Sequence, residues 1–277
     1  MPALGPRWRW RAGSARRVVM PTPFTDLVSG LAAPVSVPDD WRQGRTAYGG
    51  LSAALALAAA RRAHEGLPPL RTAQVGFVGP ATGAMAIETR VLRAGKSMTF
   101  VGTDTVGEAG PCARCLFGFG AARGSEIDMD DVPMPDVPGP EDLPAMDAGP
   151  DGPAFLQHYE VRAAAGDPPF SGAAEARFLL WVRHRDPSAR RGETALLALA
   201  DAPPPAFLSM LTKPAPTASV TWQADLLTDA HDSADGWYLC GTSGEAAVDG
   251  YGGQSHMVWA RDGEPVMAGR QSVAVFG

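Results

Sequence analysis

Two polar residues in the C-terminal half of the chain, Asp201 and Gln271, are of types that can activate a water molecule. An aspartate carboxylate can orient a water and accept its proton, and a glutamine amide can fix the water's other hydrogen bonds. Asp201 also precedes the prolines at 203–205, so it is predicted to be the N-cap of a helical segment over 206–211. A plain N-cap would contribute only about 1 kcal/mol of stability and no chemistry.

Gln271 is more informative than Asp201, because it belongs to a strand predicted over 265–276. Strand alternation places it on the same face as Met267 and Val273, which predicts a buried face. A buried amide without partners costs about 1–3 kcal/mol, so a structural hydrogen bond or a catalytic water must account for it. Cys115 stands at the matching position in the N-terminal half. This asymmetry predicts one working site and one degenerate site.

A hydroxyl and a helix N-terminus complete the candidate chemistry. Ser219 and Thr221 are two residues apart in a predicted strand, so alternation places them on one face and leaves both as candidates. Gly49 and Gly50 precede a helix predicted over 51–64, whose free N–H groups and dipole are suited to binding an oxyanion. A tight turn and close packing of the helix would explain the two glycines equally well.

The sequence does not support a metal site, a redox site or any of the common catalytic and nucleotide-binding motifs. Cys112 and Cys115 are three residues apart in a predicted strand, so they point to opposite faces and favour neither a zinc nor a redox site. The five histidines lack metal-ligand spacing. The sequence contains no Gly-x-Ser-x-Gly elbow, phosphate-binding glycine loop or dinucleotide fingerprint. No metal ion or organic cofactor is therefore expected.

The composition of the 277-residue chain is that of a folded protein, with 45% hydrophobic residues. A net charge of −6 with scattered arginines provides no basic surface for nucleic acid. The three cysteines do not suit a disulfide framework, so a reducing compartment, the cytoplasm, is expected. The longest uncharged apolar stretch, 51–60, is much shorter than the roughly 20 residues of a membrane-spanning helix.

Two segments are expected to lie outside the folded halves. Residues 1–20 are basic and lack the apolar core of a secretory signal, so they are predicted to be a disordered arm, and Met20 is an alternative start of translation. Residues 122–153 are predicted to be a linker. Between 126 and 151 the chain has nine acidic residues, six prolines and no lysine or arginine, which favours a solvated, extended spacer.

The segments on either side of this linker, 21–121 and 154–277, repeat one order of elements. In each, a central helix is followed by long strands, and both segments end alike, with Arg114-Cys115 in one and Arg270-Gln271 in the other. The first half is predicted to contain a helix at 51–64 and strands at 72–78, 84–93, 98–106 and 112–120. The second is predicted to contain a helix at 193–200 and strands at 175–185, 218–227, 237–244, 254–261 and 265–276.

In this order the residues resemble a known family, the double-hotdog acyl-CoA thioesterases similar to bacterial thioesterase II. The resemblance extends from about residue 41 to 276 and rests on several short pieces in the right order. These are Gly44-Arg45, Gly49-Gly50, Phe77 to Pro80, Val91-Leu92-Arg93-Ala94-Gly95-Lys96-Ser97, Leu199-Ala200-Asp201 and Gly269-Arg270-Gln271.

The resemblance implies an α+β fold, a double hotdog in which two antiparallel sheets each wrap a central helix. It also implies hydrolysis of acyl-CoA thioesters to a free acid and coenzyme A. The family's catalytic aspartate, at the start of the second central helix, falls on Asp201, and its glutamine falls on Gln271. The hydroxyl falls on Ser219 by spacing, but the family commonly has threonine, which leaves Thr221 open. No covalent intermediate is needed.

Two alternatives remain beside hydrolysis. Hotdog hydratases and dehydratases act on acyl thioesters, but they carry an Asp-His or Glu-His constellation, and none of the five histidines here stands in such a motif. A non-catalytic acyl-binding hotdog protein would keep the fold and use Asp201 only as a helix cap. Two fused hotdog units would reproduce the usual hotdog dimer, and association into a homo-oligomer remains open.

Overall fold

The computed structural model describes residues 21–31, 34–147, 149 and 152–276, so the arm predicted over 1–20 lies outside the described residues. The strands of the first half are β1 (Val35–Ser36), β2 (Arg42–Gln43), β3 (Thr46–Ala47), β4 (Leu70–Phe77), β5 (Ala84–Ala94), β6 (Thr99–Gly107) and β7 (Gly110–Phe119). Those of the second half are β8 (Tyr159–Gly166), β9 (Arg177–His184), β10 (Thr217–Leu226), β11 (Tyr238–Val248), β12 (Tyr251–Ala260) and β13 (Pro265–Val275).

The helices are few and short. Three are α-helices, α1 (Phe24–Ser29), α2 (Gly49–Ala63) and α3 (Glu193–Ala200), in the part of the chain that the structure describes. The 3₁₀ turns are η1 (Asp39–Trp41), η2 (Pro140–Asp142), η3 (Ala154–His158), η4 (Pro187–Ala189) and η5 (Ala206–Ser209). Both central helices predicted from the sequence are present, at 49–63 and 193–200. The sequence patterns did not predict strand β8.

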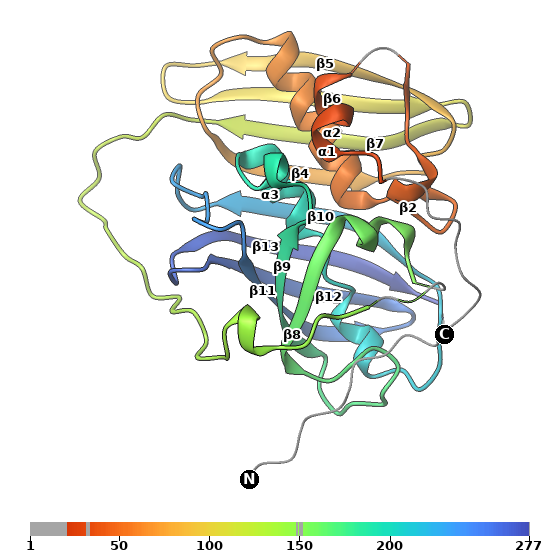
Figure 1. The fold of residues 1–277 in the computed structure, drawn as a ribbon. Coiled ribbons are helices and arrows are strands. Elements are labelled where there is room, and N and C mark those ends of the chain that lie inside the picture. Colours follow the sequence, from red (N-terminus) through yellow and green to blue (C-terminus); the bar gives the residue numbers. More distant parts are fainter. Residues whose placement is uncertain (1–20, 32–33, 148, 150–151, 277) are drawn as a thin grey trace.

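One antiparallel sheet runs through both halves (Figure 1), with the strand order β1-β5-β6-β7-β4-β10-β13-β12-β11-β9-β8 among the described residues. The prediction of two separate sheets is wrong, because β4 of the first half pairs directly with β10 of the second. In that pairing Val75 lies opposite Trp222, and both side chains are buried. The two halves therefore share one continuous sheet.

The strand order repeats between the halves. The sequence β4-β7-β6-β5 in the first half corresponds to β10-β13-β12-β11 in the second. In β7, Cys115 lies opposite Thr103 of β6, and in β13, Gln271 lies opposite Gln254 of β12. Cys115 thus occupies the place in the first half that Gln271 occupies in the second.

The central helices α2 and α3 pack closely against each other because the residues at their contact are small. A Cβ atom on Gly50 would lie 2.5 Å from the carbonyl oxygen of Ala198, so only glycine fits at that point. The Tyr48 hydroxyl donates a hydrogen bond of 2.8 Å to the same carbonyl. The buried residues of α2 after its two glycines are alanines and leucines apart from Ser52, and the helix lies against β5, β6 and β7. This contact brings the first turn of α2 to the last turn of α3.

The acidic segment between the halves is not a solvated spacer over its whole length. Its apolar side chains pack on a cluster of Trp181, Trp237, Leu239 and Trp259 in the second half, through Met134, Val137 and Leu143. The indole N–H groups of Trp181 and Trp259 donate hydrogen bonds of 3.0 and 2.8 Å to the carbonyls of Pro138 and Val132. The tryptophans supply the apolar surface that this segment lacks in itself, which corrects the prediction.

Candidate active site

Asp201 lies at the end of α3, where it is the C-cap residue with φ −90° and ψ 1°. The prediction that it caps the start of a following helix is wrong. Residues 203–205 are prolines outside any helix, and η5 after them is a short 3₁₀ turn whose N-cap is Pro205. Since Asp201 is not used as a helix N-cap, its carboxylate is free to take part in other contacts.

The structure brings Asp201, Gln271 and Ser219 together. The side-chain Nε2 of Gln271 donates to Asp201 Oδ1 over 3.0 Å and to Ser219 Oγ over 2.8 Å. These three residues come from the end of α3, from β13 and from β10. The Ser219 oxygen accepts from Gln271, so the hydroxyl proton of Ser219 remains available for a further acceptor.

Gln271 is buried, with 3% of its surface exposed, as the alternation of β13 predicted. Its neighbours Met267 and Val273 on the same face are also buried. A buried amide has to be paired, and Gln271 is paired at both ends. The polar residue on an apolar strand face therefore belongs to a hydrogen-bonded cluster.

Thr221 does not reach this cluster. A β-bulge between Ser219 and Thr221 breaks the alternation of β10, so the prediction that the two hydroxyls share a face is wrong. Thr221 is exposed, whereas the next residue, Trp222, is buried. With Arg114 among its neighbours, Thr221 lines a shallow groove on the other face of the sheet. Of the two hydroxyls, only that of Ser219 lies at the site.

The two glycines at the start of α2 contact Asp201 rather than the cavity beside it. A Cβ atom on Gly49 would lie 2.8 Å from Asp201 Oδ2, which leaves no room for a larger residue. The backbone N–H of Gly50 stabilises the Asp201 carboxylate. Neither glycine lines the cavity. The geometry therefore makes the helix start a support for Asp201, and the predicted oxyanion role of these N–H groups finds no support.

Burial raises the pKa of Asp201 from its ordinary value of 3.8 to about 7. The hydrogen bonds from Gln271 and from the Gly50 N–H act in the opposite direction, because they stabilise the charged form. The position of Asp201 after the last turn of α3 also faces it with the negative end of that helix dipole. A carboxyl with a pKa near neutrality can both accept and release a proton at physiological pH.

Two residues that the sequence analysis did not single out complete the cluster. Gln254 of β12 has 0% of its surface exposed, and its Nε2 donates to Gln271 Oε1 over 2.7 Å. His256 on the same strand has 3% of its surface exposed and lies 3.0 Å from the same Nε2 atom through its own Nε2. Burial lowers the pKa of His256 to about 4, so this ring is neutral at pH 7.

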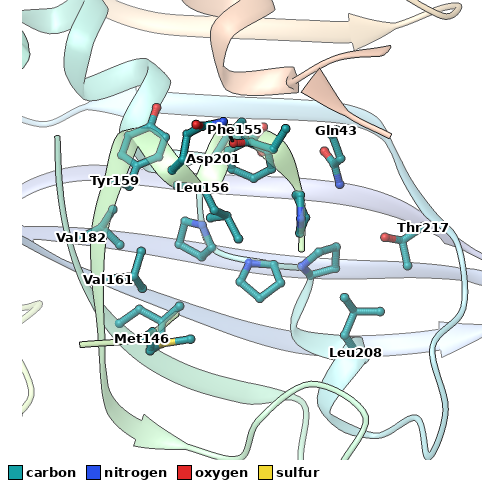
Figure 2. A pocket seen from close by; sticks show the side chains of 18 of the residues that line it. Gln43, Met146, Phe155, Leu156, Tyr159, Val161, Val182, Asp201, Leu208 and Thr217 are labelled. Atoms are coloured by element: carbon teal, nitrogen blue, oxygen red, sulfur yellow. Dashed lines mark hydrogen bonds between the residues drawn. The ribbon is translucent and has the colours of Figure 1, made fainter. Parts of the chain in front are cut away.

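A cavity of about 430 Å³ opens beside Asp201, Ser219 and Gln271. Figure 2 shows Asp201 at one edge of it, near Phe155 and Tyr159, with Met146 and Leu208 on the far side. Most of the lining is apolar and comes from the second half, including Phe155, Leu156, Val161, Leu180, Val182, Leu208 and the prolines 203–205, and the preceding acidic segment adds Met146. The site therefore places a few polar groups at one edge of an apolar cavity.

The described residues contain no group of three or more histidine, cysteine, aspartate or glutamate residues placed to hold a metal ion. His158 Nε2 lies 3.3 Å from Asp40 Oδ2, but neither residue lines the cavity beside Asp201. No histidine is among the described residues that line the cavity. Within the same part of the chain, no helix is both long enough and apolar enough to cross a membrane.

Comparison with known protein families matches most of the chain. The family model of the acyl-CoA thioesterase N-terminal domain matches residues 37–120, and that of the acyl-CoA thioesterase C-terminal domain matches residues 140–275. The match to the N-terminal domain thus precedes the match to the C-terminal domain along the chain. No curated protein matches the chain by sequence.

Solved structures with a similar fold cover nearly the full chain. A conserved protein of unknown function with a hot dog fold from Alicyclobacillus acidocaldarius is 26% identical, with a TM-score of 0.82 over 92% of this chain and 98% of its own. An acyl-CoA thioesterase II, TesB2, from Mycobacterium marinum is 20% identical, with a TM-score of 0.69 over 88% and 92%. A tesB protein of Mycobacterium avium subsp. paratuberculosis is 17% identical, with a TM-score of 0.70 over 87% and 91%. All three share the fold.

Proposed function

Since this chain belongs to the acyl-CoA thioesterase family, we propose that it hydrolyses acyl-CoA thioesters with a water molecule activated by Asp201, Gln271 and Ser219. The family makes the chain a thioester hydrolase. The identity of the catalytic residues is our proposal. It is carried by one observation: a carboxylate with a pKa of about 7 is hydrogen-bonded to a buried glutamine at the edge of an apolar cavity.

The three side chains suit direct attack by water. A water beside Asp201 donates one proton to the carboxylate and accepts the hydroxyl proton of Ser219, which leaves a lone pair of its oxygen for the thioester carbonyl carbon. Asp201 takes up the water's proton as the new C–O bond forms. The carbon–sulfur bond then breaks, and the sulfur of coenzyme A leaves with the proton that Asp201 returns. The products are a carboxylic acid and free coenzyme A, without a covalent intermediate.

The cavity is the proposed place of the acyl chain. Figure 2 shows its apolar side chains, such as Val161, Val182 and Leu208, extending away from Asp201. A thioester carbonyl next to Asp201 would thus have its hydrocarbon chain among apolar groups, at a gain of about 0.8 kcal/mol for each buried methylene. The coenzyme A part would remain outside.

The chain is proposed to consist of two fused copies of one hotdog unit, of which the second carries the chemistry. The repeated strand order supports this proposal. At the places of Gln271 and Gln254, the first half has Cys115 and Thr103. These residues cannot form the same amide pair, so the first half has no equivalent site. The N-terminus of α2 nevertheless supports Asp201, so both halves contribute to the one site.

Hydrolysis can be tested with a panel of acyl-CoAs of different chain lengths and a reagent for free thiol. We expect release of coenzyme A together with one equivalent of carboxylic acid for at least one chain length. An enoyl-CoA should lose its thioester without prior hydration of the double bond. If no acyl-CoA in the panel released thiol above background, the proposed function would be wrong, and loss of enoyl absorbance without thiol would favour a hydratase.

The pH profile should report the ionisation of Asp201. Because burial raises the pKa of this group to about 7, the proton-accepting form is lost as the pH falls below that value. The expected kcat/KM therefore falls about tenfold per pH unit well below pH 7 and is constant above it. Measurement of kcat/KM between pH 5 and 9 tests this, and a flat profile over that range would speak against Asp201 as the base.

Ser219 and Thr221 provide a matched pair of variants on one strand. Ser219→Ala removes the hydroxyl next to Gln271, so we expect kcat to fall about 10- to 100-fold through poorer positioning of the water. Thr221→Ala alters an exposed hydroxyl on the other face of the sheet and should leave kcat within about twofold of wild type. Equal losses in the two variants would contradict the assignment of the hydroxyl to Ser219.

A further inference from the structure

The side-chain amides of Gln254 and Gln271 form an oriented chain of hydrogen bonds that ends at Asp201. The chain begins at the backbone N–H of Ala206, which donates to Gln254 Oε1 over 2.9 Å. Ala206 is the first residue of η5, so its N–H has no partner within that turn. A backbone N–H can only donate, and it therefore determines which end of the Gln254 amide is the oxygen.

With its oxygen toward Ala206, Gln254 presents its NH₂ group to its other two neighbours. It donates to Gln271 Oε1 over 2.7 Å, and it lies 3.0 Å from Nε2 of His256. The neutral ring of His256 can accept at this nitrogen, so the NH₂ group has an acceptor for each proton. The Gln271 oxygen is thereby occupied, and only the NH₂ group of Gln271 can face Asp201 and Ser219.

We propose that Gln254 is a positioning residue of the active site, which holds the Gln271 amide with its NH₂ group toward Asp201 and Ser219. This inference rests on the hydrolysis proposed above and adds a residue to it. Without Gln254, the Gln271 amide could turn over and present its oxygen to the Asp201 carboxylate. The carboxylate would then lose a donor and face a partial negative charge. Both effects disfavour its charged form and so weaken it as a base at neutral pH.

A change in the pH profile can be assigned to Asp201, because the groups around it do not titrate near neutrality. Burial raises the pKa values of the tyrosines and of the thiol nearby and lowers that of the histidine. These groups are Tyr48 before α2, Tyr159 of β8, Cys240 of β11 and His256 of β12. Two exposed charged residues, Asp147 and Arg185, line the same cavity.

The test compares Gln254→Glu with wild type in acyl-CoA hydrolysis between pH 5 and 9. Glutamate has the same shape but places an acceptor where the amide donated, so Gln271 should turn over. We expect kcat at pH 8 to fall about 30- to 100-fold with KM within about twofold, because the water is mispositioned while the acyl cavity is intact. The midpoint of the pH profile should rise by about one unit or more.

Thr103→Val is the matched control, because Thr103 lies opposite Cys115 as Gln254 lies opposite Gln271. It alters a buried polar residue at the equivalent place, far along the sheet from Asp201, and should leave kcat and the midpoint unchanged. Gln254→Met removes the donor without adding a titratable group, and it should again lower kcat and raise the midpoint. A rise of the midpoint in both variants is thus assigned to Asp201 and not to the introduced carboxyl.

The outcomes separate this inference from the proposed function. If wild type hydrolyses acyl-CoA and a folded Gln254 variant keeps the wild-type kcat and midpoint, the inference is overturned and the function stands. A variant that loses kcat without any shift of the midpoint also overturns it, because that result describes a merely structural residue. If wild type itself releases no coenzyme A, the proposed function fails first.

Discussion

Replacement of Asp201 with asparagine is expected to lower kcat for acyl-CoA hydrolysis by about 1,000-fold or more, because the site then has no group that accepts the water's proton. Asparagine has nearly the same shape and can still accept a hydrogen bond from Gln271, which Asp201 accepts over 3.0 Å in the wild type. KM should therefore change little. Steady-state thiol release at pH 8 measures the effect, and a variant with more than about a tenth of wild-type kcat would exclude Asp201 as the base.

The pH dependence of the free energy of unfolding shows whether the Asp201→Asn variant is inactive only because it does not fold. The pKa of Asp201 rises from 3.8 to about 7 on folding, so the folded state holds an extra proton between these pH values. The wild type accordingly loses stability as the pH rises through this window, and the variant does not. Denaturant titrations measure the difference in the free energy of unfolding between the variant and the wild type. From pH 4 to pH 8 this difference should change in favour of Asp201→Asn by up to about 4 kcal/mol. An inactive variant that is no less stable at pH 8 is not inactive through unfolding.

Replacement of Gln271 with alanine is expected to lower kcat about 100- to 1,000-fold, because Asp201 and Ser219 lose the amide that joins them. The free energy of unfolding should also fall by about 1–3 kcal/mol, since the buried Gln254 loses an acceptor and a cavity is left. Thiol release and denaturant titration measure the two effects separately.

Cys115→Ala is the matched control for Gln271→Ala. Cys115 is buried at the equivalent place in the first half and pairs across the sheet with Thr103 in the way that Gln271 pairs with Gln254. We expect wild-type kcat for this variant, with at most a modest loss of stability. Loss of activity in Cys115→Ala to the same extent as in Gln271→Ala would mean that packing of the sheet, rather than the amide, is what activity requires.

Sequence patterns were sufficient to predict the two central helices and most of the long strands, because the strands of the repeated order have one apolar face. The same alternation predicted the burial of Gln271 correctly. It failed at Thr221, where one extra residue in a bulge reverses the face of every residue that follows. Short-range patterns do not reveal such a bulge, since its position depends on pairing with β13 and β4.

Long-range pairing also explains the other differences. The single sheet depends on β4 meeting β10, and the ordering of residues 132–143 depends on tryptophans that follow much later in the chain. Gln254 carried one usable signal, because alternation places this polar residue on the same face of a predicted strand as the apolar Val258 and Ala260. Its proposed role rests on the register that places it opposite Gln271. Asp201 was identified from its neighbours in sequence, but its proposed role rests on its burial and on its contact with the start of α2.

The most direct test of water activation by Asp201 and Gln271 is a single turnover with enzyme in excess over acyl-CoA, in which free thiol and carboxylic acid are measured in the same quenched samples. Direct attack of water releases both products from one tetrahedral intermediate, so we predict equal amounts of thiol and acid at every time point. Thiol that appears ahead of acid, with the acyl group bound to protein in the interval, would contradict the account, because it would require a covalent acyl-enzyme.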